Sequence, residues 1–339
     1  MTEQVINLLR AKFNWTSQTF TVPSWSIVRE KLLETAKSLG LPVVGILIFL
    51  LIWSGGAPKI ETSLGTVPGP SAVLSQFSSL VDEHNAARNK EAAFYARQEE
   101  RNARKLAENP NAETQIRAYT GSPTFFDQIW TSLFTVLSGF FLASIIAIPI
   151  GILSGLNKNV YAAINPIVQI FKPVSPLAWL PIVTMVVSAL YVSDDPAFEK
   201  SYLNSMFTVM LCCLWPTMIN TAVGVASINQ DLVNVSKVLK LNFFTHIYKV
   251  VLPASIPMMF TGLRLSLGIA WMVLIAAEML AQNPGLGKFV WDEFQNGSSN
   301  SLGRIMVAVV VIGLIGFFLD RVMLSLQKWV SWDKTAELR

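Results

Sequence analysis

The sequence predicts an all-α integral membrane protein with six transmembrane helices. Of its 339 residues, 52% are apolar and only 14% are charged, and the mean hydropathy is +0.46. A soluble domain carries about a quarter charged residues, so this chain lacks the polar surface that would cover a globule in water. Six apolar stretches also approach or exceed the roughly 20 residues that a helix needs to cross a bilayer.

The six spans are predicted in order along the chain, and the third differs from the others. They are expected near residues 38–58, 125–153, 161–192, 202–227, 257–281 and 302–324. The first follows about forty polar and charged residues, which a cleaved signal peptide with a short basic start would not have. The third contains four prolines within sixteen residues, so we expect it to be broken where it faces protein or a water-filled cavity.

Lysine and arginine in the short flanks of the spans predict the orientation. They gather on the side that holds both termini, so both termini are expected in the cytoplasm. The chain then divides into a cytoplasmic N-terminal segment, a first transmembrane helix, a long periplasmic loop, a five-helix core and a cytoplasmic tail. These parts are expected at residues 1–37, 38–58, 59–124, 125–326 and 327–339.

The periplasmic loop is expected to contain a charged helix over residues 82–108. This stretch is rich in Ala, Glu, Arg, Lys and Asn, and Glu100 and Arg104 are spaced as a pair one helical turn apart. The helix would serve as a solvent-facing spacer or as a docking surface for an extracytoplasmic partner. The sequence leaves both interpretations open.

Several classes of protein are excluded. Gly285 and Gly287 precede Lys288, but Phe289 follows where a phosphate-binding loop requires a hydroxyl. No nucleophile motif occurs either, so we expect neither an enzyme nor a nucleotide site in this chain. The two cysteines are adjacent and the two histidines are far apart, which disfavours a disulfide framework, a metal site or another cofactor. The net charge of +4 is spread too thinly to indicate nucleic acid.

The cytoplasmic stretch 228–256 between the fourth and fifth spans has the pattern of two short amphipathic helices. Asn242 interrupts the helical spacing of the apolar residues, and Pro253 and Pro257 are expected to end the second helix and begin the fifth span. The apolar face would pack on the protein's own helices, lie in the membrane interface, or insert into a groove of a cytoplasmic partner.

This stretch resembles the coupling loop of ABC-transporter permeases, whose pattern is E-A-A-x3-G-x9-I-x-L-P. The spacing and the final Leu252-Pro253 match, although Asn234 replaces the glutamate, Val235 and Ser236 replace the two alanines, and Lys240 replaces the glycine. Residues 172–181, 260–264, 268–271, 276–280 and 285–287 extend the resemblance to the permeases of the nitrate, sulfonate, taurine and bicarbonate import branch. The long charged outer loop and the S-P-L-A-W motif at 175–179 look most like nitrate-type members.

The resemblance implies a type I ABC importer permease in the bacterial inner membrane. Its expected partners are ABC ATPase subunits, a periplasmic substrate-binding protein and a second permease subunit, most simply a homodimer. Nitrate or nitrite is the first expected substrate, and sulfonate, taurine, bicarbonate and cyanate are alternatives. A secondary anion transporter is the rival from a different class. The expected ATPase-coupling residues are Asn234, Val235, Ser236, Lys240, Asn242, Phe243, Phe244, Ile247, Val250, Leu252 and Pro253.

Polar and aromatic residues inside the spans are the candidates for the translocation pathway, because charges there are costly. The candidates are Lys172, Ser175, Trp179, Arg264, Trp271 and Glu278. In the broken third span, a cation, a hydroxyl and an indole would line a cavity, unless Lys172 snorkels to the membrane surface. Arg264 is expected to snorkel or hold the coupling loop, and Glu278 to pair with a basic residue or act in a gate.

Overall fold

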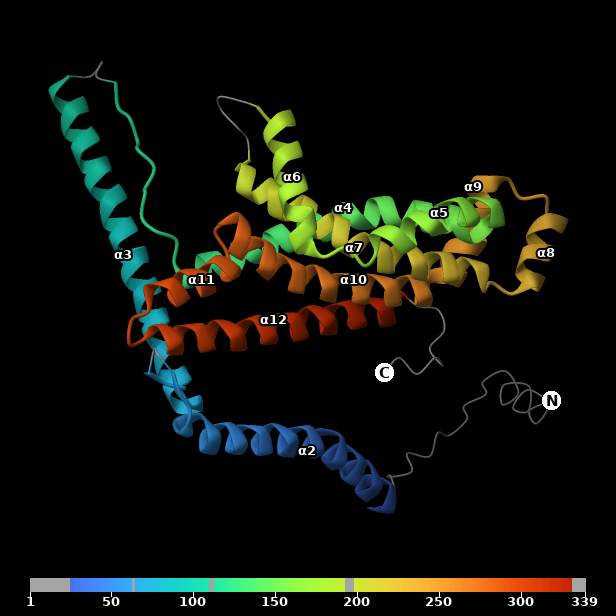
Figure 1. Ribbon diagram of the computed structural model, residues 1–339, viewed down its shortest axis with the longest axis horizontal. Coiled ribbons are helices and arrows are strands. Elements are labelled where there is room, and N and C mark those ends of the chain that lie inside the picture. Colours follow the sequence, from blue (N-terminus) through green and yellow to red (C-terminus); the bar gives the residue numbers. More distant parts are fainter. Residues whose placement is uncertain (1–24, 63–64, 110–112, 193–197, 331–339) are drawn as a thin grey trace, which may run out of the picture. The chain divides into compact units, whose positions relative to one another are not determined.

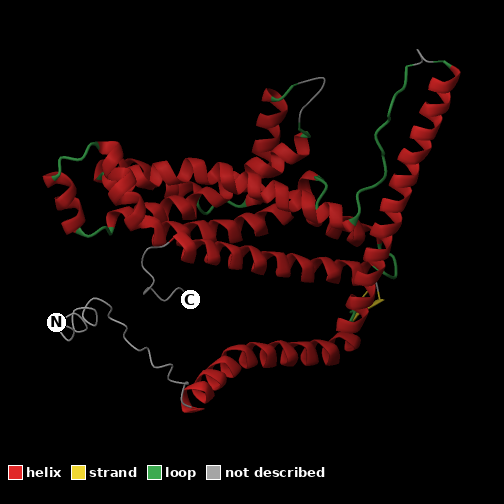
Figure 2. Cartoon of the chain, turned by 180° about the vertical axis from the view of Figure 1, so that it is seen from behind, coloured by secondary structure: helices red, strands yellow, loops and turns green. Residues whose placement is uncertain are grey.

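The computed structural model describes residues 25–62, 65–109, 113–192 and 198–330, and helices make up most of them (Figure 2). Within these ranges the strands are β1 (Glu61–Thr62) and β2 (Gly65–Thr66), which form one antiparallel pair. Five described helices are long and apolar enough to cross a membrane, and a sixth span results if one bent pair is counted as a single span. The predicted all-α membrane fold is confirmed.

The N-terminal part of the chain forms a compact unit of its own, which ends at Lys59. It contains α2 (Trp25–Gly56) and the 3-10 turn η1 (Ala57–Lys59), and its apolar stretch Gly40–Lys59 matches the first predicted span. Most large apolar side chains between Leu41 and Ile52 are more than half exposed, as lipid-facing side chains are. Most of the predicted segment 1–37 and of the tail 327–339 lies outside the described residues.

Three helices form the centre of the second unit: α4 (Phe125–Leu156), α7 (Lys200–Ala226) and α10 (Leu252–Ala281). α12 (Ser301–Val330) lies along α10 (Figure 1). The face of α4 toward α7 carries a small residue at every fourth position, at Gly139, Ala143, Ala147, Gly151 and Gly155. A Cβ atom at Gly151 would lie 2.7 Å from the Cβ of Thr221. The two backbones therefore approach as closely as in the small-residue interfaces typical of membrane helices.

The third span is broken, as predicted, into α5 (Lys158–Phe171) and α6 (Pro176–Leu190), which meet at 102°. Two of its four prolines lie inside these helices, whereas Pro173 and Pro176 flank the bend. Proline removes a backbone donor and disfavours helix in the residue before it, so two prolines three residues apart end one helix before the next begins. Ser175 then caps α6 by accepting a hydrogen bond from the nitrogen of Leu177 at 3.3 Å.

The charged helix α3 (Pro70–Glu108) is longer than predicted and begins twelve residues earlier, with Pro70 in its first turn. The predicted pair between Glu100 and Arg104 is present at 2.6 Å. The chain then returns along α3 as an extended segment. The side-chain amide of Gln98 donates to the carbonyl of Arg117 and accepts from its nitrogen, at 2.8 and 2.9 Å. α3 and the segment 113–124 thus form one braced element.

The stretch 228–256 differs from the prediction at its end. α8 (Gln230–Val238) is separate, but α9 (Phe243–His246), the π-helical turn η2 (Ile247–Val251) and α10 form one continuous helix from Phe243 to Ala281. The expectation that Pro253 and Pro257 stop this helix is wrong. The nitrogen of Leu252 bonds the carbonyl of Ile247, five residues back. This wider turn directly precedes Pro253, in the region where the proline ring would otherwise crowd an ordinary α-helical turn.

Candidate functional site

The hairpin of α8 and α9 lies at the end of the bundle where α4 ends and α10 begins (Figure 1). Asn229 caps α8 by accepting from the nitrogen of Asp231 at 2.9 Å. The helix ends in a Schellman motif, in which the nitrogen of Leu241 bonds the carbonyl of Ser236 at 3.1 Å. This motif requires one residue in the left-handed backbone conformation. Lys240 adopts this conformation, with a φ of 48°.

Side chains hold the two short helices at a set angle. Asn242 caps α9 by accepting from the nitrogen of Thr245 at 2.8 Å. The hydroxyl of Ser236, which is buried, lies 2.7 Å from Nδ1 of His246 and joins α8 to α9. The hairpin is therefore a braced structure rather than a loose linker.

Seven exposed side chains, six of this hairpin and one of the adjoining η2, make up what we call the apolar ridge. They are Leu232, Val235, Val238, Leu239, Phe243, Phe244 and Tyr248. Val238 and Phe244 are each 80% exposed. The other face packs on the bundle, where Val233 of α8, together with Ile247 and Leu252 of the adjoining η2 and α10, contacts the buried cluster around Val251.

The residues predicted to couple to an ATPase thus fall into different environments. Val235, Phe243 and Phe244 belong to the apolar ridge, whereas Ile247 and Leu252 face the bundle and Val250 is half-buried. Ser236 and Asn242 brace or cap the hairpin. Asn234, Lys240 and Pro253 are exposed. The sequence grouped these residues by their helical spacing. Spacing does not show on which side of the hairpin the bundle lies, so it could not separate the exposed side chains from the packed ones.

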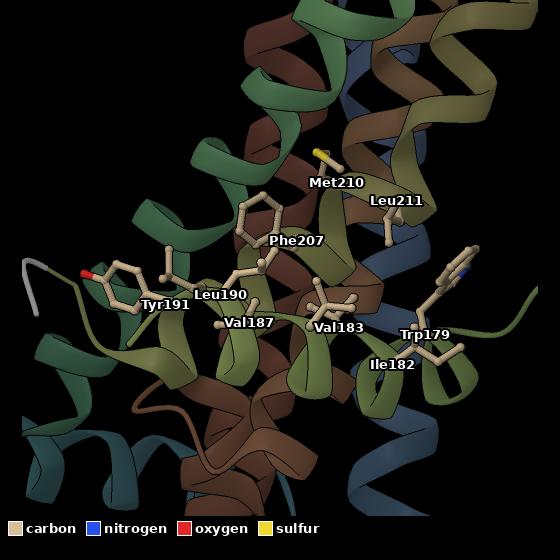
Figure 3. Close-up of a pocket in the computed structure, with 11 residues that line it drawn as sticks. Trp179, Ile182, Val183, Val187, Leu190, Tyr191, Phe207, Met210 and Leu211 are labelled. Atoms are coloured by element: carbon tan, nitrogen blue, oxygen red, sulfur yellow. The ribbon is translucent and has the colours of Figure 1, made fainter. Parts of the chain in front are cut away.

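The pathway candidates of the broken third span do not share one cavity. Trp179 lines an apolar cavity of about 560 Å³ between α6 and α7, together with Val183, Val187, Phe207 and Met210 (Figure 3). Lys172 instead lines a cavity of about 150 Å³ between α5, α7 and the end of α4. Ser175 caps α6 and lines neither of these two cavities.

Aromatic packing fixes the bend between α5 and α6. The ring of Phe171 lies 5.7 Å from that of Trp179 and stacks on Trp215 of α7 at 6.3 Å. This cluster holds Trp179 toward α7, on the side of the apolar cavity, while Lys172 follows the course of α5.

Arg264 is paired within the chain. Its Nε and Nη2 atoms donate to the two carboxylate oxygens of Asp320 on α12, at 3.0 and 3.1 Å. About two helical turns away, Trp271 is buried and donates its indole N–H to the carbonyl of Ile312 at 3.0 Å. Both residues therefore join α10 to α12.

Glu278 is fully buried and forms a junction of three helices. Its carboxylate accepts from the hydroxyl of Ser132 at 2.7 Å and from the nitrogen of Gly287 at 2.9 Å. The same hydroxyl accepts from the nitrogen of Leu286 at 2.9 Å. These nitrogens open α11 (Leu286–Asn296), whose own capping residue, Gly285, has no side chain. No basic residue pairs with Glu278 in the described part of the chain. The described residues therefore do not contain the basic partner that was one of the two expectations for Glu278.

Three features of this region went unrecognised in the sequence. Ser132 and Asp320 are remote in sequence from Glu278 and Arg264, with which they pair, and no local pattern indicates these pairs. The third feature is Arg304, which binds Glu83 of α3 through two hydrogen bonds of 2.8 and 3.0 Å. Its Nε also lies 2.6 Å from the carboxylate of Glu293, an ion pair within the α11–α12 junction.

Comparison with known proteins adds independent information. A family model described as "binding-protein-dependent transport system inner membrane component" matches residues 147–332. The chain is 34% identical over 295 residues to a bicarbonate transport system permease protein, CmpB, of Synechococcus elongatus, which covers 86% of this chain and 88% of that protein. It is 40% identical over 205 residues to a nitrate import permease protein, NrtB, of Leptolyngbya laminosa, covering 60% and 68%.

Solved structures also show similarity. A chain of the MetNI methionine ABC transporter, in an inward-facing conformation, aligns with a TM-score of 0.48 and 14% identity. The alignment covers 61% of this chain and 96% of the MetNI chain.

Proposed function

The chain belongs to the family of binding-protein-dependent transport system inner membrane components, and from this premise we propose that it is the membrane-spanning subunit of an ATP-driven importer for a small anion. It would form the translocation pathway and receive the energy of ATP hydrolysis from a separate cytoplasmic ATPase. The proposal rests on the residues of the braced hairpin and on the relatives named above.

The observation that carries this proposal is the apolar ridge. Exposed aromatic and aliphatic side chains on a helix are the means by which helices insert into grooves of partner proteins. Val238 and Phe244 would be such anchors, because the hairpin is held from behind by the packing of Ile247 and Leu252. The left-handed backbone of Lys240 supports the same interpretation, since the family's coupling pattern has glycine at this position.

Transport energetics explain why a partner is needed. Moving a monovalent anion into a cell that is negative inside is opposed by about 2.3 kcal/mol per 100 mV. A passive pore cannot accumulate the anion against this potential. The resemblance to type I importer permeases supplies the form of this partnership: we infer two ATPase subunits beneath two copies of this chain, a binding protein on the outer side, and a location in the bacterial inner membrane. The distribution of Lys and Arg in the short flanks leads us to infer that both termini are in the cytoplasm.

Nitrate or nitrite remains our first proposed substrate, and bicarbonate is the second. Nitrate and bicarbonate are both small, three-oxygen anions of a single negative charge, so one pathway chemistry suits either. Relatives named for each anion are similar to this chain, at 40% identity for nitrate and 34% for bicarbonate. Sulfonate, taurine and cyanate are the remaining substrates of the branch that the sequence resembles.

A secondary transporter is the competing function, and Glu278 is the feature that would favour it, because coupling ions often bind buried carboxylates. However, the carboxylate of Glu278 is occupied by the hydroxyl of Ser132 and the nitrogen of Gly287. This bonding favours a structural role in holding α11, and so supports the ATP-driven importer over its rival.

Co-purification with the ATPase subunit tests the proposal. We expect the wild-type chain, extracted in mild detergent, to bring down a stoichiometric ATPase, and the substitutions Val238→Asp and Phe244→Asp to abolish this association. Ile116→Asp is the matched control, because Ile116 is 68% exposed but lies on the segment that returns along α3.

The fold must be intact for this comparison, so the variants should elute as the wild type does in size-exclusion chromatography. Retention of the ATPase by both ridge variants would contradict the coupling assignment. A chain that purifies alone, and moves nitrate or bicarbonate in liposomes without ATP, would establish the secondary transporter instead.

A further inference from the structure

The cavity beside α5 is lined by more polar side chains than the apolar cavity between α6 and α7. Four polar side chains line it from one face of α5, at Tyr161, Asn165, Gln169 and Lys172. Their spacing of four, four and three residues places them on a single helical stripe. The opposite wall comes from α7, mainly from Met218 and Ala222, and the cavity measures about 150 Å³.

The polar side chains that α5 contributes make few bonds within the protein, and of these Tyr161, Gln169 and Lys172 are exposed at the mouth of the cavity, whereas Asn165 is half-buried. The amide nitrogen of Gln169 lies 3.5 Å from the amide oxygen of Asn165, which is a weak contact. No carboxylate in the described part of the chain pairs with Lys172, and no acidic side chain lines the cavity.

A buried hydroxyl points to a ligand. Ser154, at the end of α4, lines the cavity and is 6% exposed, and its hydroxyl has no hydrogen-bond partner among the described residues. Buried polar groups are nearly always hydrogen-bonded, and leaving one without a partner is costly. A molecule in the cavity would supply the missing partner.

We propose that this cavity is a binding subsite for the transported anion, with Lys172 as its cation and Ser154 as a hydrogen-bond donor. The inference rests on the proposed function and assigns a site to it. A cation, hydroxyls and side-chain amides are the groups that bind a small oxyanion through charge-assisted hydrogen bonds. The volume leaves room for a four-atom anion with water, since about 10–15 Å³ already holds one water molecule.

The apolar cavity between α6 and α7 provides the contrast. It is larger, but its lining is mostly aliphatic and aromatic and contains no cation, and its hydrogen-bond donors are the indole of Trp179 and the hydroxyl of Tyr191 at its two ends (Figure 3). An anion would lose its hydration there with no cation to compensate. The polar stripe of α5 therefore marks the cavity that suits a charged substrate.

A purely structural role for Lys172 makes different predictions. Lys172 follows the last turn of α5, where a cation is favoured by the free carbonyl groups of the helix end. In that case Lys172→Gln would lower stability without changing substrate affinity. Ser154→Ala separates the two roles further, because removal of an unpartnered buried hydroxyl would then stabilise the protein and leave transport unchanged.

The test is nitrate and bicarbonate uptake by the chain reconstituted with its ATPase and binding protein. We expect Lys172→Gln to raise the substrate concentration at half-maximal uptake tenfold or more, and Ser154→Ala to raise it several-fold, whereas Lys172→Arg retains most of the affinity. Lys158→Gln is the control, because Lys158 is an exposed lysine at the other end of α5 and does not line the cavity.

A second measurement keeps the subsite separate from the proposed function. Nitrate, at constant ionic strength against chloride, should raise the thermal unfolding temperature of the purified full chain, and Lys172→Gln should remove this effect. If both substitutions at 172 and 154 leave half-maximal uptake and this stabilisation unchanged, the subsite is wrong. If the wild type shows no ATP-dependent uptake of either anion yet is stabilised by nitrate through Lys172, the importer function is wrong and the subsite stands.

Discussion

The carboxylate of Glu278 on α10 and the hydroxyl of Ser132 on α4 are hydrogen-bonded at 2.7 Å, and together they cap a third helix. Their oxygens accept from the first two backbone nitrogens of α11, at Leu286 and Gly287. A Cβ atom on Gly285 would lie 2.3 Å from this carboxylate, so only glycine allows the chain to turn here. A capping function usually performed by one local side chain is divided between two helices that are remote in sequence.

Ser132→Ala should destabilise the protein by about 1–3 kcal/mol, because it removes a donor from a buried carboxylate and an acceptor from the nitrogen of Leu286. The measurement is thermal unfolding in detergent. Ser138→Ala is the control on the same helix, since the hydroxyl of Ser138 donates to the carbonyl of Phe134, one turn back in its own helix. Equal unfolding temperatures for the two variants would contradict the capping role of Ser132.

Lys240→Gly should stabilise the hairpin by about 1 kcal/mol, because a non-glycine residue in the left-handed conformation costs about this amount. Lys237→Gly, three residues earlier in α8, should have the opposite sign, since glycine inside a helix costs about 1 kcal/mol. Hydrogen exchange of α8 amides in both variants measures the difference. Slower exchange in Lys237→Gly than in Lys240→Gly would show that the end of α8 is not as described.

Gly151→Ala should lower stability by about 1–3 kcal/mol, because the added methyl group would lie 2.7 Å from Thr221 and force α4 away from α7. Gly268→Ala offers a matched control inside α10, where a Cβ would meet nothing within 4 Å and alanine favours the helix. Thermal unfolding should therefore shift down in the first variant and stay level or rise in the second. A downward shift common to both would indicate a general sensitivity to substitution.

The pair between Arg264 and Asp320 should contribute on the order of 1 kcal/mol to the packing of α10 against α12, since it is bidentate but partly exposed. Asp320→Asn should lower the unfolding temperature, and the exchanged pair Arg264→Asp with Asp320→Arg should recover part of the loss. Asp292→Asn is the control, because its pair with Lys288 is an exposed contact within one helix. No recovery in the exchanged pair, beside a clear loss in Asp320→Asn, would mean that the charge of Arg264 serves another group.

Arg304→Gln should loosen α3 from the bundle, because Arg304 joins Glu83 of α3 to Glu293 of α11. We expect faster hydrogen exchange in the first half of α3. Arg104→Gln is the control, since Arg104 pairs only with Glu100 on the exposed surface of α3. Unchanged exchange near Glu83 in the Arg304 variant would show that other contacts, such as Arg88 with Asp127, hold α3 by themselves.

Local signals in the sequence predicted the elements well. Apolar length indicated the spans, the prolines around Lys172 indicated the broken third span, and the spacing of Glu100 and Arg104 indicated the charged helix. Asn242 was correctly expected to interrupt the helical spacing of the apolar residues. This interruption could be predicted because a side chain that caps a helix bonds to backbone groups only two or three positions away. The prediction that the helix ends at Pro253 was wrong. A π-helical turn before the proline lets the helix continue, and the pattern of apolar residues does not indicate such a turn.

What the sequence by itself determined is therefore whatever depends on near neighbours: the membrane helices, their interruptions, and the motif that ends in Leu252 and Pro253. Which faces meet was decided only by the tertiary structure. Periodicity placed Phe244 and Ile247 together, yet one lies on the apolar ridge and the other packs on the bundle. Likewise Lys172 and Trp179 are two turns apart in sequence but line different cavities, because the 102° bend turns their helices in different directions. Contacts such as Glu278 with Ser132 span 146 residues, and no local pattern encodes them.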